Sequence, residues 1–111
     1  MDISKKLHLL SEKIAGELYF DSLMKSLYST DASVYREIPL AVCYPKNKND
    51  LKLLIEFAAQ NNTSLIPRAA GTSLAGQCTG EGIIVDISKY FTKILKIDAK
   101  QKTVTIQPGV I

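Results

Sequence analysis

The stretch that decides how this sequence is interpreted is PRAAGTSLAGQCTGEG, at residues 67–82. Four of the six glycines of the chain lie in it, and only two of its residues are charged. It follows the short apolar segment Leu65–Ile66, which predicts a strand. A loop of Gly, Ala, Ser and Thr after a strand exposes successive backbone N–H groups, and such a nest binds phosphate without side-chain charge. The stretch therefore predicts a loop that binds phosphate or pyrophosphate, to which Arg68, Thr72 and Ser73 can add donors.

Two well-known phosphate motifs are absent from this loop. A Walker A motif requires Lys and then Ser or Thr after its second glycine, whereas Gly76 is followed by Gln77 and Cys78. The dinucleotide motif G-x-G-x-x-G opens a helix, whereas residues 80–82 run into an expected strand. A plain flexible loop is the simplest alternative. The length of the low-charge run and the strands on both sides favour a binding loop.

The apolar patterns on both sides of the loop predict short helices and strands. They predict, in chain order, a helix at 3–18, a helical turn around 23–27, a strand at 40–44, a helix capped by Asn47 that continues through 51–59, strands at 65–66 and 83–87, and hairpin strands at 94–98 and 103–107. Because a strand, a helix and a strand follow one another, we expect a parallel pair with a right-handed crossover. The predicted fold class is α+β, with a small parallel βαβ-containing sheet and a C-terminal β-hairpin.

Length, composition and charge restrict the possible functions. The 111 residues form at most one domain, and 46% hydrophobic with 23% charged residues is typical of a globular chain. The net charge of +3 is small and dispersed, so we expect no nucleic-acid partner, although weak nucleic-acid binding is kept as an alternative. No apolar run approaches the ~20 residues that span a bilayer, and we expect neither a transmembrane segment nor a signal peptide.

Cysteine and histidine are too scarce for a metal site. The chain has Cys43, Cys78 and a single histidine, His8, whereas structural zinc takes four ligands. We therefore expect no metal. Two reduced thiols indicate a cytoplasmic protein, with a disulfide as the unsupported alternative.

Several other polar residues have structural interpretations. We expect Asp86 to cap a turn rather than to bind a ribose, and Asp31 to make local turn hydrogen bonds. Tyr28 and Tyr35 are interpreted as packing residues. For Arg68, at the start of the loop, a ligand role and a structural ion pair are both open.

Residues 67–77 resemble the pyrophosphate loop of FAD-linked oxidases with a PCMH-type FAD-binding domain, which are relatives of vanillyl-alcohol oxidase. The sequence is most similar to the branch of glycolate oxidase subunits and D-lactate dehydrogenases. Three further segments resemble this branch and occur in the same order, at 28–36, 45–51 and 107–110. The four segments lie between residues 28 and 110 and so span most of the chain after residue 16.

The resemblance implies FAD as the cofactor, held without a covalent link. Some relatives attach FAD through a histidine at the position of Thr72, and no histidine stands there. Arg68 can add positive charge at the start of the loop. The other cofactor-binding residues implied are Ala69, Ala70, Gly71, Thr72 and Ser73 at the pyrophosphate, Gly76 and Gln77 further along that wall, and Pro108, Gly109 and Val110 beside the flavin or the ribityl chain.

The resemblance also implies that this chain is one part of a longer enzyme, which we call the parent. Residues 1–111 are expected to be the N-terminal FAD-binding subdomain of a flavoenzyme, with the second FAD subdomain and the substrate domain absent. The parent is expected to oxidise a 2-hydroxy acid such as lactate or glycolate. We expect no catalytic residue in this chain and no activity from it alone. The alternative is a stand-alone nucleotide-binding or interaction module without catalysis.

Overall fold

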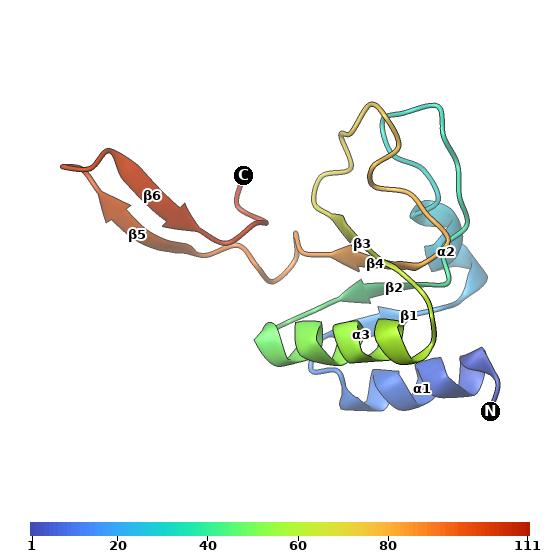
Figure 1. The fold of residues 1–111 in the computed structure, drawn as a ribbon. Coiled ribbons are helices and arrows are strands. Elements are labelled where there is room, and N and C mark those ends of the chain that lie inside the picture. The colour runs from blue at the N-terminus through green and yellow to red at the C-terminus, as the bar shows by residue number, and fades with distance from the viewer.

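The computed structural model describes residues 1–111, which form three helices and six strands (Figure 1). In chain order the elements are α1 (Ile3–Lys13), β1 (Glu17–Tyr19), α2 (Ser22–Leu27), β2 (Ala41–Tyr44), α3 (Lys48–Gln60), β3 (Leu65–Arg68), β4 (Ile83–Asp86), β5 (Ile94–Asp98) and β6 (Thr103–Ile106). The first four strands form one sheet, and β5 and β6 form a separate hairpin. None of the helices has the length and apolar character that a membrane span requires.

The four-stranded sheet has the order β1-β2-β4-β3. Strand β4 runs parallel to both of its neighbours, and Ile84 is paired with Val42 of β2 on one side and Ile66 of β3 on the other. Strand β1 pairs antiparallel with β2 at the edge. The two strands joined through α3 are therefore parallel but are separated by β4. The predicted α+β class, with a parallel βαβ unit and a C-terminal hairpin, is confirmed.

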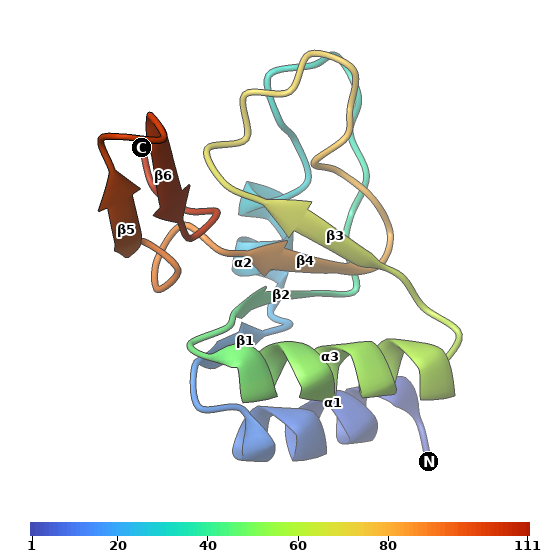
Figure 2. The ribbon, with the colours of Figure 1, turned by 60° about the vertical axis from the view of Figure 1, so that its left-hand side comes forward.

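The core lies between the sheet and a layer formed by α1 and α3, which lie side by side along one face (Figure 2). Its members are Leu7, Leu10, Ile14, Leu54 and Phe57 from the helical side and Ala41, Cys43, Ile83 and Val85 from the sheet. Strand side chains alternate between faces, so Val42 and Ile84 point away from this cluster, and both are also fully buried. Burial on both faces explains why β2 and β4 are continuous apolar runs in the sequence.

The starts of the long helices agree with the sequence prediction, whereas the end of the first helix does not. Asp2 caps α1, and the Asn47 side chain caps α3 by accepting the Asp50 N–H at 2.9 Å. The predicted helix at 3–18 is wrong after Lys13, because the chain turns there and continues as β1. The apolar spacing continues into β1 because that strand also packs on the core.

A buried carboxylate fixes this turn. Asp50 accepts hydrogen bonds from the N–H groups of Ala15 at 2.8 Å, Gly16 at 2.9 Å and Lys46 at 2.8 Å, and it is fully buried. A Cβ on Gly16 would lie 1.9 Å from the Tyr44 carbonyl oxygen, so only glycine allows the two backbones to approach this closely. Asp50, in the first turn of α3, thus ties the end of α1 to the chain that follows β2.

The β5–β6 hairpin projects from the rest of the molecule (Figure 1). Every residue of β6 and all but the last of β5 are exposed. Two backbone bonds hold its base: the Gln107 N–H donates to the Lys93 carbonyl at 2.9 Å, and the Gly109 N–H donates to the Phe91 carbonyl at 2.7 Å. The hairpin itself was predicted, but its separation from the core was not.

Candidate functional site

The glycine-rich loop, residues 69–82, connects the end of β3 to the start of the neighbouring parallel strand β4 (Figure 1). Within it, only Gly71 and Gly76 have positive φ, at 69° and 78°. This left-handed region favours glycine. Neither Ala69 nor Ala70 has a positive φ, so the loop conformation accommodates alanine at both positions.

The first limb of the loop presents backbone donors without partners. No N–H group of residues 69–73 donates to another group of the protein. Residues 69, 70 and 72 are exposed, and residues 71 and 73 are half-buried. A row of available N–H groups beside small side chains can hold the oxygens of a phosphate. The backbone of the loop therefore offers donors of the kind that a phosphate or pyrophosphate requires.

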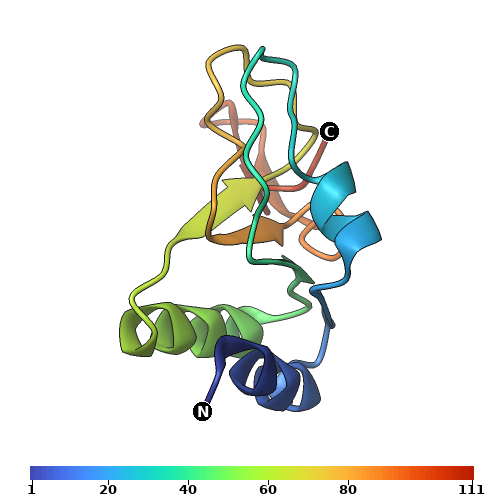
Figure 3. The same ribbon diagram turned by 90° about the vertical axis from the view of Figure 1, so that its right-hand side faces the viewer.

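A second segment, residues 30–36, lies beside the loop, and we call it the brace segment (Figure 3). The Ala32 N–H donates to the Gly71 carbonyl at 3.0 Å. On the other limb of the loop, the Cys78 N–H donates to Asp31 Oδ2 at 3.3 Å. The brace segment thus contacts both limbs, although it lies more than thirty residues earlier in the chain.

Asp31 and Tyr35 give the brace segment its shape. Asp31 Oδ1 accepts the Ser33 N–H at 2.8 Å, which confirms the predicted turn bond. The Ser33 side chain and the N–H groups of Ser33 and Cys78 stabilise the carboxylate, and together they hold the pKa of Asp31 below its ordinary value. The Tyr35 ring lies against Gly76, where a Cβ would be 2.9 Å from the ring.

The guanidinium of Arg68, the last residue of β3, donates hydrogen bonds to main-chain carbonyl oxygens. Nη1 donates to the Thr30 carbonyl at 2.6 Å and to the Cys78 carbonyl at 3.4 Å. The group also lies over the Tyr28 ring, 5.1 Å from its centroid. The two ion pairs of the structure involve other residues, so the structural ion pair that the sequence left open for Arg68 is not formed.

Tyr28 is anchored to the sheet beneath the loop. Its hydroxyl donates to Asp86 Oδ2 at 2.6 Å and lies 2.5 Å from the Tyr44 hydroxyl. Burial and the bond to Asp86 raise the pKa of Tyr28 above its ordinary value. Asp86 Oδ1 accepts the Ser88 N–H at 2.9 Å, which confirms the predicted turn cap. The Tyr28–Asp86 pair was missed because the residues are 58 positions apart and no local pattern links them.

The predicted segment 108–110 meets the start of the loop through the turn after β4. The Ile87 N–H donates to the Arg68 carbonyl at 3.0 Å. Gly109 lies against the carbonyl group of Ile87. A Cβ added to Gly109 would be only 2.5 Å from the Ile87 carbonyl oxygen and 2.6 Å from the Phe91 carbonyl oxygen. The structure therefore brings both sequence-predicted segments to the carboxyl ends of β3 and β4, where ligands bind in parallel α/β sheets.

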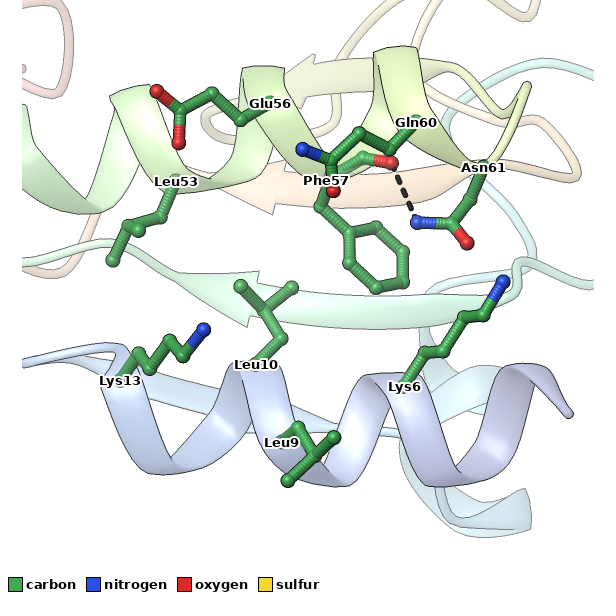
Figure 4. A pocket seen from close by; sticks show the side chains of 9 residues that line it. All are labelled: Lys6, Leu9, Leu10, Lys13, Leu53, Glu56, Phe57, Gln60 and Asn61. Atoms are coloured by element: carbon green, nitrogen blue, oxygen red, sulfur yellow. Dashed lines mark hydrogen bonds between the residues drawn. The ribbon is translucent and has the colours of Figure 1, made fainter. Parts of the chain in front are cut away.

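A groove between α1 and α3 is a second hollow on the surface (Figure 4). Leu10 and Phe57 line it together with exposed polar side chains, and the Asn61 amide donates to the Phe57 carbonyl at 2.9 Å. Glu56 is its only acidic side chain, and it offers no backbone nest. No group of three or more His, Cys, Asp or Glu side chains that could hold a metal ion occurs in the structure. The loop after β3 therefore remains the candidate site.

A sheet whose central strand β4 runs parallel to both neighbours, with a loop of available N–H groups at the carboxyl end of β3, is an arrangement typical of nucleotide-binding domains. Comparison with known families agrees and is more specific. The family described as "FAD binding domain" matches residues 39–111. This chain belongs to that FAD-binding domain family, and FAD is its cofactor.

Sequence relatives place the chain near dehydrogenases and oxidases of hydroxy acids. It is 41% identical over 86 residues to D-2-hydroxyglutarate dehydrogenase of Escherichia coli K12, covering 75% of this chain and 8% of that protein. It is 34% identical over 103 residues to the glycolate oxidase subunit GlcD of Bacillus subtilis 168, covering 89% of this chain and 22% of that protein. The chain thus spans less than a quarter of either relative.

Solved structures share the fold. An alkyldihydroxyacetonephosphate synthase superposes with a TM-score of 0.82 at 17% identity, over 100% of this chain and 23% of that one. The 4-ethylphenol oxidase from Gulosibacter chungangensis gives 0.74 at 20% identity, over 96% and 22%. The resemblance to FAD-linked oxidases and the assignment of FAD are confirmed.

Proposed function

We propose that this chain is the FAD-binding portion of a flavin-dependent oxidoreductase that oxidises a 2-hydroxy acid such as lactate or glycolate. The observation that carries the proposal is the row of unpartnered N–H groups at residues 69–73, on a fold of the FAD-binding domain family. The names of the sequence relatives support the substrate class, since they include a glycolate oxidase subunit and D-lactate and D-2-hydroxyglutarate dehydrogenases.

In this proposal the chain binds and orients the cofactor. Arg68 contributes at the start of the loop by supporting it. FAD, when bound, supplies the capacity to accept two electrons from the substrate. Because Thr72 is not a nucleophile of the kind that forms a flavin link, binding is non-covalent. The residues proposed to line the cofactor are Ala69, Ala70, Gly71, Thr72 and Ser73, then Gly76 and Gln77, and Pro108, Gly109 and Val110.

We further propose that residues 1–111 are the N-terminal subdomain of the FAD site and that substrate and catalytic groups belong to other parts of such an enzyme. The small share of each relative that the chain covers supports this division. We assign no catalytic residue to this chain and expect no turnover from it alone. The two free cysteines, Cys43 and Cys78, support a reducing, cytoplasmic setting.

FAD titration tests the cofactor assignment. We expect saturable quenching of flavin fluorescence by the protein, and its loss in Gly71→Val, because a side chain there meets the Arg68 guanidinium in a left-handed backbone conformation. Ala75→Val, at an exposed residue outside the left-handed positions, is the matched control and retains binding. Equal affinity of wild type and Gly71→Val would contradict the loop as the binding element.

Dye reduction tests the substrate class. The proposed longer enzyme, purified from its source, is assayed with lactate and glycolate. Ethanol serves as the control, because it has the hydroxyl group and lacks the carboxylate. We expect reduction with the hydroxy acids alone. Equal rates with ethanol would contradict a 2-hydroxy acid substrate, and turnover by residues 1–111 with added FAD would contradict the proposed division of labour.

A further inference from the structure

The Arg68 side chain connects three segments that are distant in the sequence. Its Nη1 donates at 2.6 Å to the Thr30 carbonyl in the brace segment and at 3.4 Å to the Cys78 carbonyl in the second limb of the loop. Arg68 itself is the residue from which the first limb leaves β3. One guanidinium nitrogen therefore links both ends of residues 68–78 to the brace segment.

A ring fixed to the sheet supports the guanidinium from below. Arg68 lies 5.1 Å from the centroid of Tyr28, a distance at which a cation interacts favourably with an aromatic face. The Tyr28 hydroxyl donates to Asp86, which is 5% exposed and ends β4. Tyr28 thus fixes the Arg68 guanidinium relative to the four-stranded sheet.

The second guanidinium nitrogen lies directly beneath the nest. A Cβ on Gly71 would be 2.6 Å from Arg68 Nη2, so the guanidinium occupies the space in which a side chain of residue 71 would lie. The Gly71 carbonyl accepts the Ala32 N–H from the brace segment. Support from the guanidinium and from the brace segment therefore converges on the residue whose left-handed conformation shapes the nest.

We propose that Arg68 is a positioning residue, whose guanidinium holds both limbs of the loop against the brace segment and so keeps the N–H groups of residues 69–73 available. The consequence for FAD affinity rests on the proposed function, whereas the effect on the loop does not. Lysine cannot replace it, because the guanidinium places one nitrogen at two carbonyls and a second nitrogen beside Gly71 at the same time, whereas an ammonium is a single compact donor group. A direct phosphate contact, in contrast, is one that lysine can make.

The test compares Arg68→Lys and Arg68→Met with Arg36→Lys. Arg36 is the only other arginine and is exposed in the brace segment, so it provides a matched control. The first measurement is amide hydrogen exchange without FAD. In both Arg68 variants we expect the Ala32 and Cys78 amides to exchange at least ~10-fold faster, because the bonds of these amides depend on the loop position. The amide of Ile84 keeps its rate, and Arg36→Lys leaves all three unchanged.

The second measurement is the FAD titration at two salt concentrations. We expect Arg68→Lys to weaken binding as much as Arg68→Met, by about 10-fold or more, since both lose the guanidinium that contacts the two carbonyls, Gly71 and the Tyr28 ring. Retained affinity in Arg68→Lys with loss in Arg68→Met would overturn the inference in favour of a direct charge contact. A wild-type chain that binds no FAD would contradict the proposed function, and the exchange rates would still decide the role of Arg68.

Unchanged exchange of Ala32 and Cys78 in Arg68→Lys would overturn the inference directly. If Arg68→Lys also speeds exchange at Ile84, the sheet itself is disturbed and a second variant is needed. Tyr28→Leu is that variant, because it removes the supporting ring and leaves Arg68 in place. The inference then requires faster exchange at Ala32 and Cys78 with Ile84 protected, and unchanged rates at the first two amides overturn it.

Discussion

The central strands of the sheet and the strands of the hairpin have similar sequences and opposite surroundings. Residues 83–85 are Ile-Ile-Val and residues 94–97 are Ile-Leu-Lys-Ile. Ile83, which faces the helical layer, is 0% exposed, whereas Ile97 is 72% exposed. Similar apolar residues thus form a core in one region and an open surface in the other. The difference is the helical layer, because α1 and α3 cover the sheet and no element covers the hairpin.

The comparison shows where the folding free energy of this chain resides. Burial of apolar side chains is the main stabilising contribution, at about 25 cal/mol per Å². The sheet and its two helices obtain that contribution, whereas an isolated two-stranded hairpin is marginally stable at best. We therefore expect substitutions in the sheet layer to dominate stability and substitutions in the hairpin to have little effect.

The largest effect is expected for Asp50→Ala. It leaves the N–H groups of Ala15, Gly16 and Lys46 without their buried acceptor, and we expect a loss of about 4 kcal/mol in the free energy of unfolding. Urea denaturation followed by circular dichroism measures it. Asp98→Ala, in the hairpin, is the control for loss of a carboxylate. A loss below about 1 kcal/mol for Asp50→Ala would show that this buried carboxylate does not tie the layers together.

Leu54→Ala is expected to follow. Leu54 is fully buried between α3 and the sheet, and truncation of such a side chain removes about 3 kcal/mol. Ile55→Ala, at the next position on the same helix, is the matched control because Ile55 is 60% exposed. The two free energies of unfolding are compared in the same denaturant series. Equal losses would remove burial as the explanation of the contrast between the two regions.

A smaller, pH-dependent effect is expected at the edge of the sheet. Lys89 Nζ donates to both Glu17 oxygens, at 2.8 and 2.9 Å, and the Tyr90 hydroxyl donates to Glu17 at 2.7 Å. These bonds lower the pKa of Glu17 below 4.5, with the bond from Lys89 as the largest cause. Because the pKa of Glu17 is lower in the folded state, its carboxylate stabilises the fold at pH values above the pKa of the unfolded state. That stabilisation is lost as the pH falls through the pKa of the folded state. The pair is partly exposed, so solvent screens it and we expect its contribution to be smaller than that of Asp50 or Leu54.

Glu17→Gln measures this contribution. We expect the melting temperature of the variant to lie below that of wild type at pH 7, and the difference to be smaller at pH 3, because a lower pH protonates more of the wild-type carboxylate. A difference of the same size at both pH values would contradict an ionic origin.

The smallest effect is expected in the hairpin. Ile97→Ser replaces an exposed side chain, so we expect the free energy of unfolding to change by less than about 0.5 kcal/mol. Urea denaturation measured beside Leu54→Ala is the appropriate comparison. A loss comparable to that of Leu54→Ala would show that the hairpin packs in solution against a surface that buries Ile97.

Local patterns in the sequence predicted much of the fold. The apolar runs at β2 and β4, the Asn47 cap and the alternation in the hairpin each reflect a force that acts over a few residues. The β1 strand was missed because its apolar positions continue the helical spacing, and only the contact with Tyr44 and Asp50 ends the helix. The exposure of the hairpin could not be predicted, since alternation reports a strand and not what covers it.

The candidate site shows the same division. The composition of the glycine-rich loop predicted its available N–H groups, because small residues and an irregular backbone are local properties, and its binding role stays a prediction. The brace segment and the Tyr28–Asp86 pair depend on contacts across more than thirty residues and leave no periodic signal. For Arg68 the sequence left two roles open, and the structure shows a third arrangement, on carbonyl oxygens.

The position of β4 between β2 and β3 has a consequence for how the chain acquires its fold. During synthesis β3 emerges before β4, and β4 is its only partner in the sheet. The connection between them is the glycine-rich loop, so closure of that loop is the step that completes the sheet. Pulse-labelling during refolding is therefore expected to show protection of β3 and ordering of residues 69–82 with one rate constant. We therefore expect the row of N–H groups at residues 69–73 to take its final arrangement when β3 pairs with β4.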